Sequence, residues 1–162
     1  MSSETTTSES KSNATGNNLE RFVLHALRDK GYTEFWNHKN TAFESRAAIG
    51  GKQYMRWLPV GTTIYKTQRI ADFFIVNPAL FPSNLIIECK WQQVSGSVDE
   101  KYPFLLFNII RTGIPTVILL DGGGYKPAAL AWLKDQVNPD GALQAVWTMA
   151  EFQTRVNNGF LG

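Results

Sequence analysis

The spacing of apolar residues changes from a helical to a strand-like period within the first half of the chain. Residues 17–31 carry apolar positions at helical spacing up to a final glycine, which predicts the first helix. Over residues 43–76, β-branched and aromatic residues take over, punctuated by glycine and proline, so we expect two or three strands. Residues 70–76 are an almost unbroken apolar run that only Asp72 interrupts, as in a strand covered on both faces.

Strands and helices alternate in the second half. Turns are expected at Asn77-Pro78 and Pro82-Ser83, and Pro103 interrupts the next helix near its start. The expected elements are, in order, a strand at 84–92, a helix at 98–113, a strand at 115–121, a helix at 126–137, a strand at 142–149 and a helix at 150–159. A strand, helix, strand order predicts parallel pairing, so we expect an α/β fold with a mixed central β-sheet flanked by helices.

Composition favours one folded domain preceded by a short tail. Residues 1–16 are almost wholly Ser, Thr, Glu, Asn and Gly, so we expect a disordered Ser/Thr-rich tail before a single domain at 17–162. The chain has 43% hydrophobic and 12% aromatic residues, enough for an apolar core. Cys89 is the only cysteine, which excludes an intrachain disulfide and fits a reducing cytoplasm. Neither a secretory signal nor a membrane-spanning run is apparent.

Two acidic residues interrupt apolar strands, where an uncompensated charge is costly. Within residues 84–92 the alternation places Glu88, Lys90 and Gln92 on one face, and Asp72 lies in the preceding strand. Mg²⁺ prefers carboxylate oxygens and activates water for phosphodiester hydrolysis, so Asp72 and Glu88 are candidate ligands. Lys90 could neutralise the phosphate or, if nearby metal charge lowers its pKa, orient the attacking water. The alternative for all three residues is a structural ion pair between strands.

The order of Asp72 and then Glu88-x-Lys90 resembles the motif of the PD-(D/E)xK nuclease superfamily, over roughly residues 18–120. Ala71 stands where the name of the motif has proline. The resemblance implies a restriction-endonuclease-like core of order α-β-β-β-α-β, followed here by a C-terminal α-β-α extension. It also implies a metal-dependent deoxyribonuclease that uses Mg²⁺, with Mn²⁺ able to substitute.

By the same resemblance, four further residues gain roles. Glu20 would be an additional catalytic acid and metal ligand, and the backbone carbonyl of Cys89 a further metal ligand. Gln92 would be an additional catalytic residue, and Lys101 a second phosphate contact. Other interpretations remain open, because Asn17-x-x-Glu20 is spaced like a helix capping box, Gln92 suits a solvated strand end, and Lys101 suits an ordinary helix surface.

The stretch from residue 46 to residue 71 is basic and holds no acidic residue, although the net charge of the whole chain is only +2. Tyr54, Trp57 and Tyr65 are interleaved with its cations, so a hairpin here could contact phosphates, sugars and bases. The alternative is an ordinary solvated hairpin whose aromatic residues lie in the core. The residues expected to contact double-stranded DNA are Arg46, Lys52, Arg56, Lys66, Arg69 and Lys101.

These features predict a Mg²⁺-dependent DNA endonuclease, sequence-specific and of homing or restriction type, in the cytoplasm of a bacterial or phage-infected cell. The alternatives are a Holliday-junction resolvase of the same superfamily, a catalytically inactive DNA-binding module and a protein-interaction domain. Because one site cuts one strand, we expect a homodimer or a higher homo-oligomer. Residues 121–126 lack the spacing of a phosphate-binding loop and are expected to form a tight turn with left-handed residues.

Overall fold

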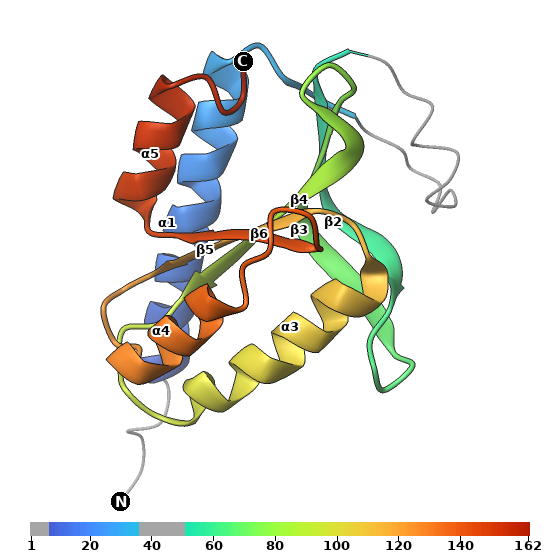
Figure 1. Ribbon diagram of the computed structural model, residues 1–162. Coiled ribbons are helices and arrows are strands. Elements are labelled where there is room, and N and C mark those ends of the chain that lie inside the picture. The colour runs from blue at the N-terminus through green and yellow to red at the C-terminus, as the bar shows by residue number, and fades with distance from the viewer. Residues whose placement is uncertain (1–6, 36–50) are drawn as a thin grey trace, which may run out of the picture.

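The centre of the protein is a mixed β-sheet (Figure 1). The computed structural model describes residues 7–35 and 51–162. In that part of the chain the sheet has six strands, in the order β1-β2-β3-β4-β5-β6. The strands are β1 Thr33–Glu34, β2 Gln53–Thr62, β3 Gln68–Asn77, β4 Phe81–Trp91, β5 Thr116–Asp121 and β6 Leu143–Trp147. Neighbours among β2, β3 and β4 are antiparallel, whereas β4, β5 and β6 are parallel and β1 runs parallel to β2.

Helices cover both faces of this sheet. They are α1 Thr7–Asp29, the 3₁₀ helix η1 Ser97–Glu100, α3 Lys101–Thr112, α4 Pro127–Asp135 and α5 Met149–Asn157. One buried cluster joins α1 and α5 to the sheet through residues such as Leu27, Phe73 and Phe152. A second cluster joins α3 and α4 to the opposite face through residues such as Ile109 and Ile118. Figure 1 shows α1 beside α5 and α3 beside α4, so the predicted α/β architecture and its restriction-endonuclease-like order are confirmed.

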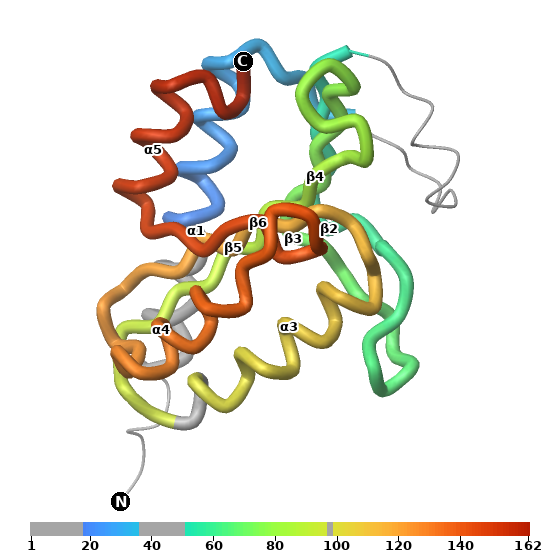
Figure 2. Tube along the Cα trace, in the orientation of Figure 1, coloured from blue at the N-terminus to red at the C-terminus, as the bar shows by residue number. Residues whose placement is uncertain are grey.

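The β2–β3 hairpin is strongly curved. Figure 2 shows its tip lying beside α3, where Tyr65 stacks on Phe104, while its other end lies near the end of the chain. Trp57 in β2 has a positive φ of 50°, and the pairing register shifts between Pro59 and Thr62. Such irregularities bend a strand and increase its twist. The hairpin packs against α1 through residues such as Tyr54 and Ile75, and its tip contacts α3 through Ile64 and Tyr65. The candidate site lies between these two contacts.

Two local predictions were wrong. Strand β4 begins at Phe81, so Pro82-Ser83 lies within a strand and the turn is confined to residues 78–80. Proline is tolerated there because β5 first pairs with β4 at Ile86 and the pairing of β4 with β3 is irregular between Phe81 and Leu85. Helix α1 begins at Thr7, so residues 7–16 are helical where a disordered tail was expected. Once the packed turns around Leu19 form, extending a helix costs little more per residue.

Pro103 lies in the first turn of α3, where the helix tolerates proline because the first backbone N–H groups have no partner within a helix. The preceding η1 turn accounts for the interruption that the sequence predicts. None of the described helices combines the length and the apolar character needed to cross a bilayer.

Candidate active site

The site lies where β3 and β4 separate. The paired positions of the two strands end at Phe73 and Ile87; beyond them β3 continues beside β2, and β4 continues beside β5. At this fork the backbone N–H of Cys89 donates to the Asp72 carboxylate at 2.7 Å. The neighbouring strand therefore holds Asp72 in place at the point where the sheet opens.

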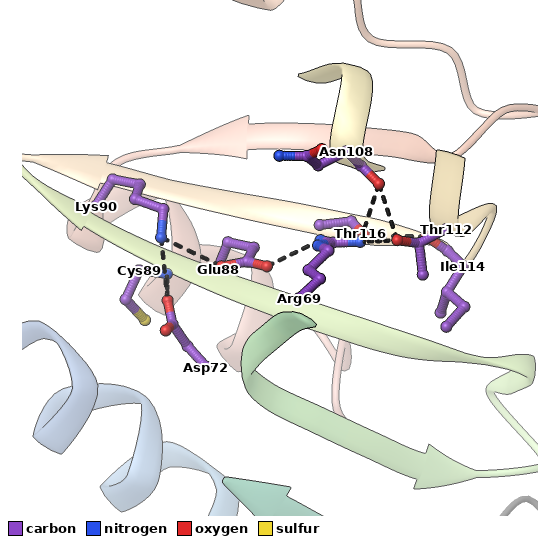
Figure 3. A network of polar contacts seen from close by, with 9 residues as sticks. All are labelled: Arg69, Asp72, Glu88, Cys89, Lys90, Asn108, Thr112, Ile114 and Thr116. Atoms are coloured by element: carbon purple, nitrogen blue, oxygen red, sulfur yellow. Dashed lines mark hydrogen bonds and ion pairs between the residues drawn. The ribbon is translucent and has the colours of Figure 1, made fainter. Parts of the chain in front are cut away.

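Glu88 and Lys90 bring a second carboxylate and an ammonium group to the fork (Figure 3). The Lys90 Nζ lies 3.2 Å from Glu88 Oε2 and 3.5 Å from Asp72 Oδ2. Glu88 is only 2% exposed, whereas the Lys90 side chain is 38% exposed. The Lys90 ammonium thus lies between two carboxylates, and the lysine side chain is partly exposed to solvent.

The carboxylates keep Lys90 charged. Burial alone would lower the pKa of the Lys90 ammonium, but Glu88 and Asp72 outweigh burial and raise that pKa above its ordinary value. Burial raises the pKa of Glu88, while Lys90 and then Arg69 act in the opposite direction. A charged lysine suits the stabilisation of phosphate charge, whereas a proton-accepting lysine needs a lowered pKa.

These donors suit a hard divalent cation. In the part of the chain that the structure describes, no three acidic, histidine or cysteine side chains form a ready-made metal cluster. Mg²⁺, however, is usually held by one or two carboxylates together with water and substrate oxygens. At the fork, the Lys90 ammonium already contacts the carboxylates of both Asp72 and Glu88. Because the N–H and C=O of one residue point to the same side of a strand, the Cys89 carbonyl also faces β3.

Arg69 is buried inside the site. It is 5% exposed, and its Nη2 donates to Glu88 Oε1 at 2.9 Å. Its Nη1 donates to the Asn108 carbonyl at 3.3 Å and to the Thr112 hydroxyl. This placement contradicts the expectation that Arg69 is a surface cation for DNA, because its guanidinium is already committed to Glu88 and α3.

Glu20 approaches the fork from α1. It is partly buried; burial and then the Asp72 carboxylate raise its pKa, while Arg56 and Lys90 lower it. These influences place Glu20 within electrostatic reach of the other acids. The capping-box interpretation is wrong, because α1 begins at Thr7 and Glu20 is far from its first turn.

Gln92 supports the end of β4. It is 3% exposed, so the solvated strand end that the sequence allowed is wrong. Its Oε1 accepts from the Tyr102 hydroxyl, and its Nε2 donates to Asp99 Oδ1 at 3.2 Å and to the Gly124 carbonyl at 3.4 Å. Because both ends of the amide have partners within the protein, this placement speaks against a direct contact between Gln92 and the substrate.

The glycine turn after β5 packs against the same strand end. Gly122 and Gly123 have left-handed φ values of 104° and 72°, as the sequence predicts for a tight turn. A Cβ at Gly124 would lie 2.2 Å from the backbone carbon of Gln93, so only glycine fits there. The turn therefore closes on the end of β4 and does not form a phosphate-binding loop.

A cleft of about 410 Å³ opens beside Glu88 and Lys90, between β3, β4 and α3. Lys101, which is exposed at the start of α3, lines this cleft. Lys66 is exposed at the tip of the β2–β3 hairpin, where Tyr65 stacks on Phe104 of α3 with ring centroids 5.1 Å apart. A larger groove of about 1150 Å³ along β6 and the start of β4 includes none of the predicted catalytic residues.

The other expected DNA contacts lie away from this cleft. The Arg56 Nε lies 3.2 Å from Glu34 Oε1, on the α1 side of the hairpin. Lys52 precedes β2 and donates to the Lys30 carbonyl at 3.1 Å, at the end of the hairpin opposite its tip. Arg46 falls outside the described residues, so the structure places four of the five cations expected between residues 46 and 71, and of these four it brings only Arg69 to Glu88.

Asn108 belongs to the site but was not among the residues predicted from the sequence. Asn108 is a polar residue inside the apolar stretch of α3, and it is 4% exposed. Its carbonyl binds Arg69, and its side-chain Oδ1 accepts the Ile64 N–H of the hairpin at 2.8 Å. Thr112 and Tyr102 carried no such signal.

Comparison with known proteins agrees with this arrangement. A family profile described as a PD-(D/E)XK nuclease superfamily domain matches residues 11–160. No curated protein and no solved structure matches the chain. The matched region contains the fork with Asp72, Glu88 and Lys90, and it extends into α5 and beyond. The chain belongs to the PD-(D/E)XK nuclease superfamily.

Proposed function

We propose that this protein is a Mg²⁺-dependent DNA endonuclease that hydrolyses phosphodiester bonds with a metal-activated water. The observation that carries this proposal is the position of the Lys90 ammonium between the Asp72 and Glu88 carboxylates, at a fork in the sheet beside an open cleft. A buried Glu88 and a partly buried Asp72 that contact the same ammonium group need positive charge, and a metal ion with a scissile phosphate would supply a reason for the arrangement.

Asp72, Glu88 and the Cys89 carbonyl are the proposed metal ligands, with Glu20 as an additional acid. When bound, Mg²⁺ would lower the pKa of a water molecule and screen charge on the phosphate. Lys90 would stabilise the negative charge that develops on the phosphate, because its ammonium lies beside both proposed carboxylate ligands. The alternative role, orienting the attacking water, would require the bound metal ion to lower the pKa of Lys90.

Double-stranded DNA is the proposed substrate. Lys101 on the cleft and Lys66 with Tyr65 on the hairpin tip would contact its backbone and bases, since all three side chains are exposed. Sequence-specific cleavage of homing or restriction type, and a homodimer that cuts both strands, complete the proposal.

One set of digests tests the function. We would incubate the protein with supercoiled plasmid, linear duplex or a four-way junction, in Mg²⁺, Mn²⁺ or chelator. Metal-dependent cutting of plasmid and duplex is expected, with loss of cutting in Asp72→Ala and Lys90→Ala but not in Lys134→Ala, a distant exposed lysine. Cutting of the junction alone would select a resolvase. Binding without cutting would select an inactive DNA-binding module.

The proposed DNA surface has its own test. Lys66→Ala should weaken duplex binding and reduce the slope of affinity against salt, while Mn²⁺ binding stays unchanged. Lys52→Ala is the matched control, because Lys52 lies at the other end of the hairpin. Equal effects of the two substitutions would exclude the hairpin tip as a specific contact.

A further inference from the structure

We propose that Arg69 is a positioning residue that decides which oxygen of Glu88 is available to a divalent cation. The inference rests on the proposed function, since it assigns a task to Glu88 as a metal ligand. It concerns a residue that the sequence pattern had assigned to the DNA surface.

The contacts of Arg69 are directional. Figure 3 shows its guanidinium between Glu88 and the end of α3. Nη2 donates to Glu88 Oε1, while Nη1 donates to the Asn108 carbonyl and to the Thr112 hydroxyl. The Thr112 hydroxyl in turn donates to the Asn108 carbonyl at 2.8 Å, which fixes this acceptor pair at the last turn of α3. A planar guanidinium whose Nη1 and Nη2 both donate hydrogen bonds has little freedom to rotate.

These contacts of Arg69, which we call the clamp, leave the two carboxylate oxygens of Glu88 with different partners. Oε1 is occupied by Arg69, and Oε2 faces Lys90 at 3.2 Å, on the side where Asp72 lies. Glu88 can therefore offer one oxygen, Oε2, to a cation that also contacts Asp72. Without Arg69 the carboxylate could turn or bind a cation through both oxygens.

A purely structural role explains the arrangement less well. Buried ion pairs often contribute little net stability compared with apolar residues of similar size. The Arg69 and Glu88 side chains are 5% and 3% exposed, so their desolvation cost is high. Residues that orient metal ligands from behind typically change metal affinity or activity by about 10- to 100-fold when they are replaced.

The test uses Arg69→Met, Arg69→Lys and Thr112→Val in the full chain, with Arg28→Met on the exposed last turn of α1 as a control. Folding is checked by circular dichroism and thermal melting. Binding of Mn²⁺ alone is measured by calorimetry, duplex affinity is measured in Ca²⁺, and single-turnover cleavage is measured at saturating duplex.

Arg69→Met should lower Mn²⁺ affinity and the saturated cleavage rate by about tenfold or more, with duplex affinity changed less than about twofold. Arg69→Lys should recover part of the loss, because an ammonium group keeps the positive charge but cannot donate to Glu88 and to α3 in the fixed planar geometry of a guanidinium. Thr112→Val should act in the same direction with a smaller effect. Arg28→Met should match the wild type.

Three results would overturn the inference. A folded Arg69→Met with wild-type Mn²⁺ affinity and saturated rate would leave Arg69 a structural residue. Weaker duplex binding with an unchanged saturated rate would make it a phosphate contact. If Arg69→Met does not fold, an unchanged Mn²⁺ affinity in Thr112→Val decides against the clamp. A wild-type protein that binds Mn²⁺ but cuts no DNA would refute the proposed function, while the Mn²⁺ comparison would still test Arg69.

Discussion

Replacing Lys90 with Met separates the two tasks of this lysine, because the substitution removes the ammonium that Asp72 and Glu88 share and keeps a side chain of similar length. Without a metal ion, the variant leaves two carboxylates close together, and Arg69 contacts only Glu88. We expect the metal-free protein to lose stability, and the metal-bound protein to recover it.

The distances set the size of the effect. At 3.2 Å and 3.5 Å, each attraction is about 5 kcal/mol at an effective dielectric constant of roughly 20. Desolvation offsets much of this energy, and solvent screens a side chain that is 38% exposed. We therefore expect a net loss of about 1 to 3 kcal/mol in chelator, which lowers the melting temperature of a chain of this size by about 2 to 12 °C.

Divalent metal should reverse this loss. Because no ammonium competes for the two carboxylates, Mn²⁺ should raise the melting temperature of Lys90→Met by more than that of the wild type. Cleavage should nevertheless fall by about 100-fold or more, since the ammonium group that would stabilise the phosphate beside the metal ion is gone.

The assay is thermal melting in chelator and over a series of Mn²⁺ concentrations, beside plasmid cleavage. Lys134→Met is the control, because Lys134 pairs with Glu151 at 3.7 Å on the surface, where the lysine side chain is 43% exposed. Its stability should change by less than about 1 kcal/mol. An unchanged melting temperature of Lys90→Met in chelator, or a smaller shift with Mn²⁺ than in the wild type, would refute the shared-cation arrangement.

Three further predictions concern residues that support the fold. Gln92→Leu should cost about 2 to 4 kcal/mol in urea unfolding, because it removes the acceptor of the buried Tyr102 hydroxyl and one donor to Asp99; a loss below 1 kcal/mol would contradict that network. Burial and then Asp99 raise the pKa of Tyr102 to about 12. The folded state therefore favours the neutral phenol, and this contribution is present below pH 10 and lost as pH rises towards 12. Tyr102→Phe should show a flatter fall in melting temperature over that window, and an identical slope would refute the assignment. Thr148→Ala should cost about 1 kcal/mol, since it breaks the capping box with Glu151, whereas Thr148→Ser should cost little; equal unfolding midpoints for both would count against the cap.

Most elements could be predicted because their signals are local. The helical period of residues 19–27 and the apolar run of 70–76 each report the burial of one face or of both faces of their own element. The start of α1 was placed too late, because a helix can extend into a polar segment once its packed turns exist. The turn before β4 was placed wrongly, because proline at an unpaired strand position looks like a loop in sequence.

The roles of the cations could not be predicted in the same way. Lys52, Lys66 and Arg69 look alike in one basic stretch, yet the curved hairpin places them at its base, at its tip and inside the site. Which cation meets Glu88 depends on strand register and on the position of α3. Both depend on contacts between residues far apart in the chain, such as Arg69 and Thr112.

By itself the sequence determined the order of helices and strands, because the spacing of apolar residues is a property of short segments. It also determined that two acids and a lysine lie within apolar strands, where a buried charge is costly. Only the tertiary structure decided that β3 and β4 separate beside Asp72, that Arg69 holds Glu88, and that Gln92 supports a strand end. Those outcomes depend on how separate elements pack against one another, which no short segment encodes.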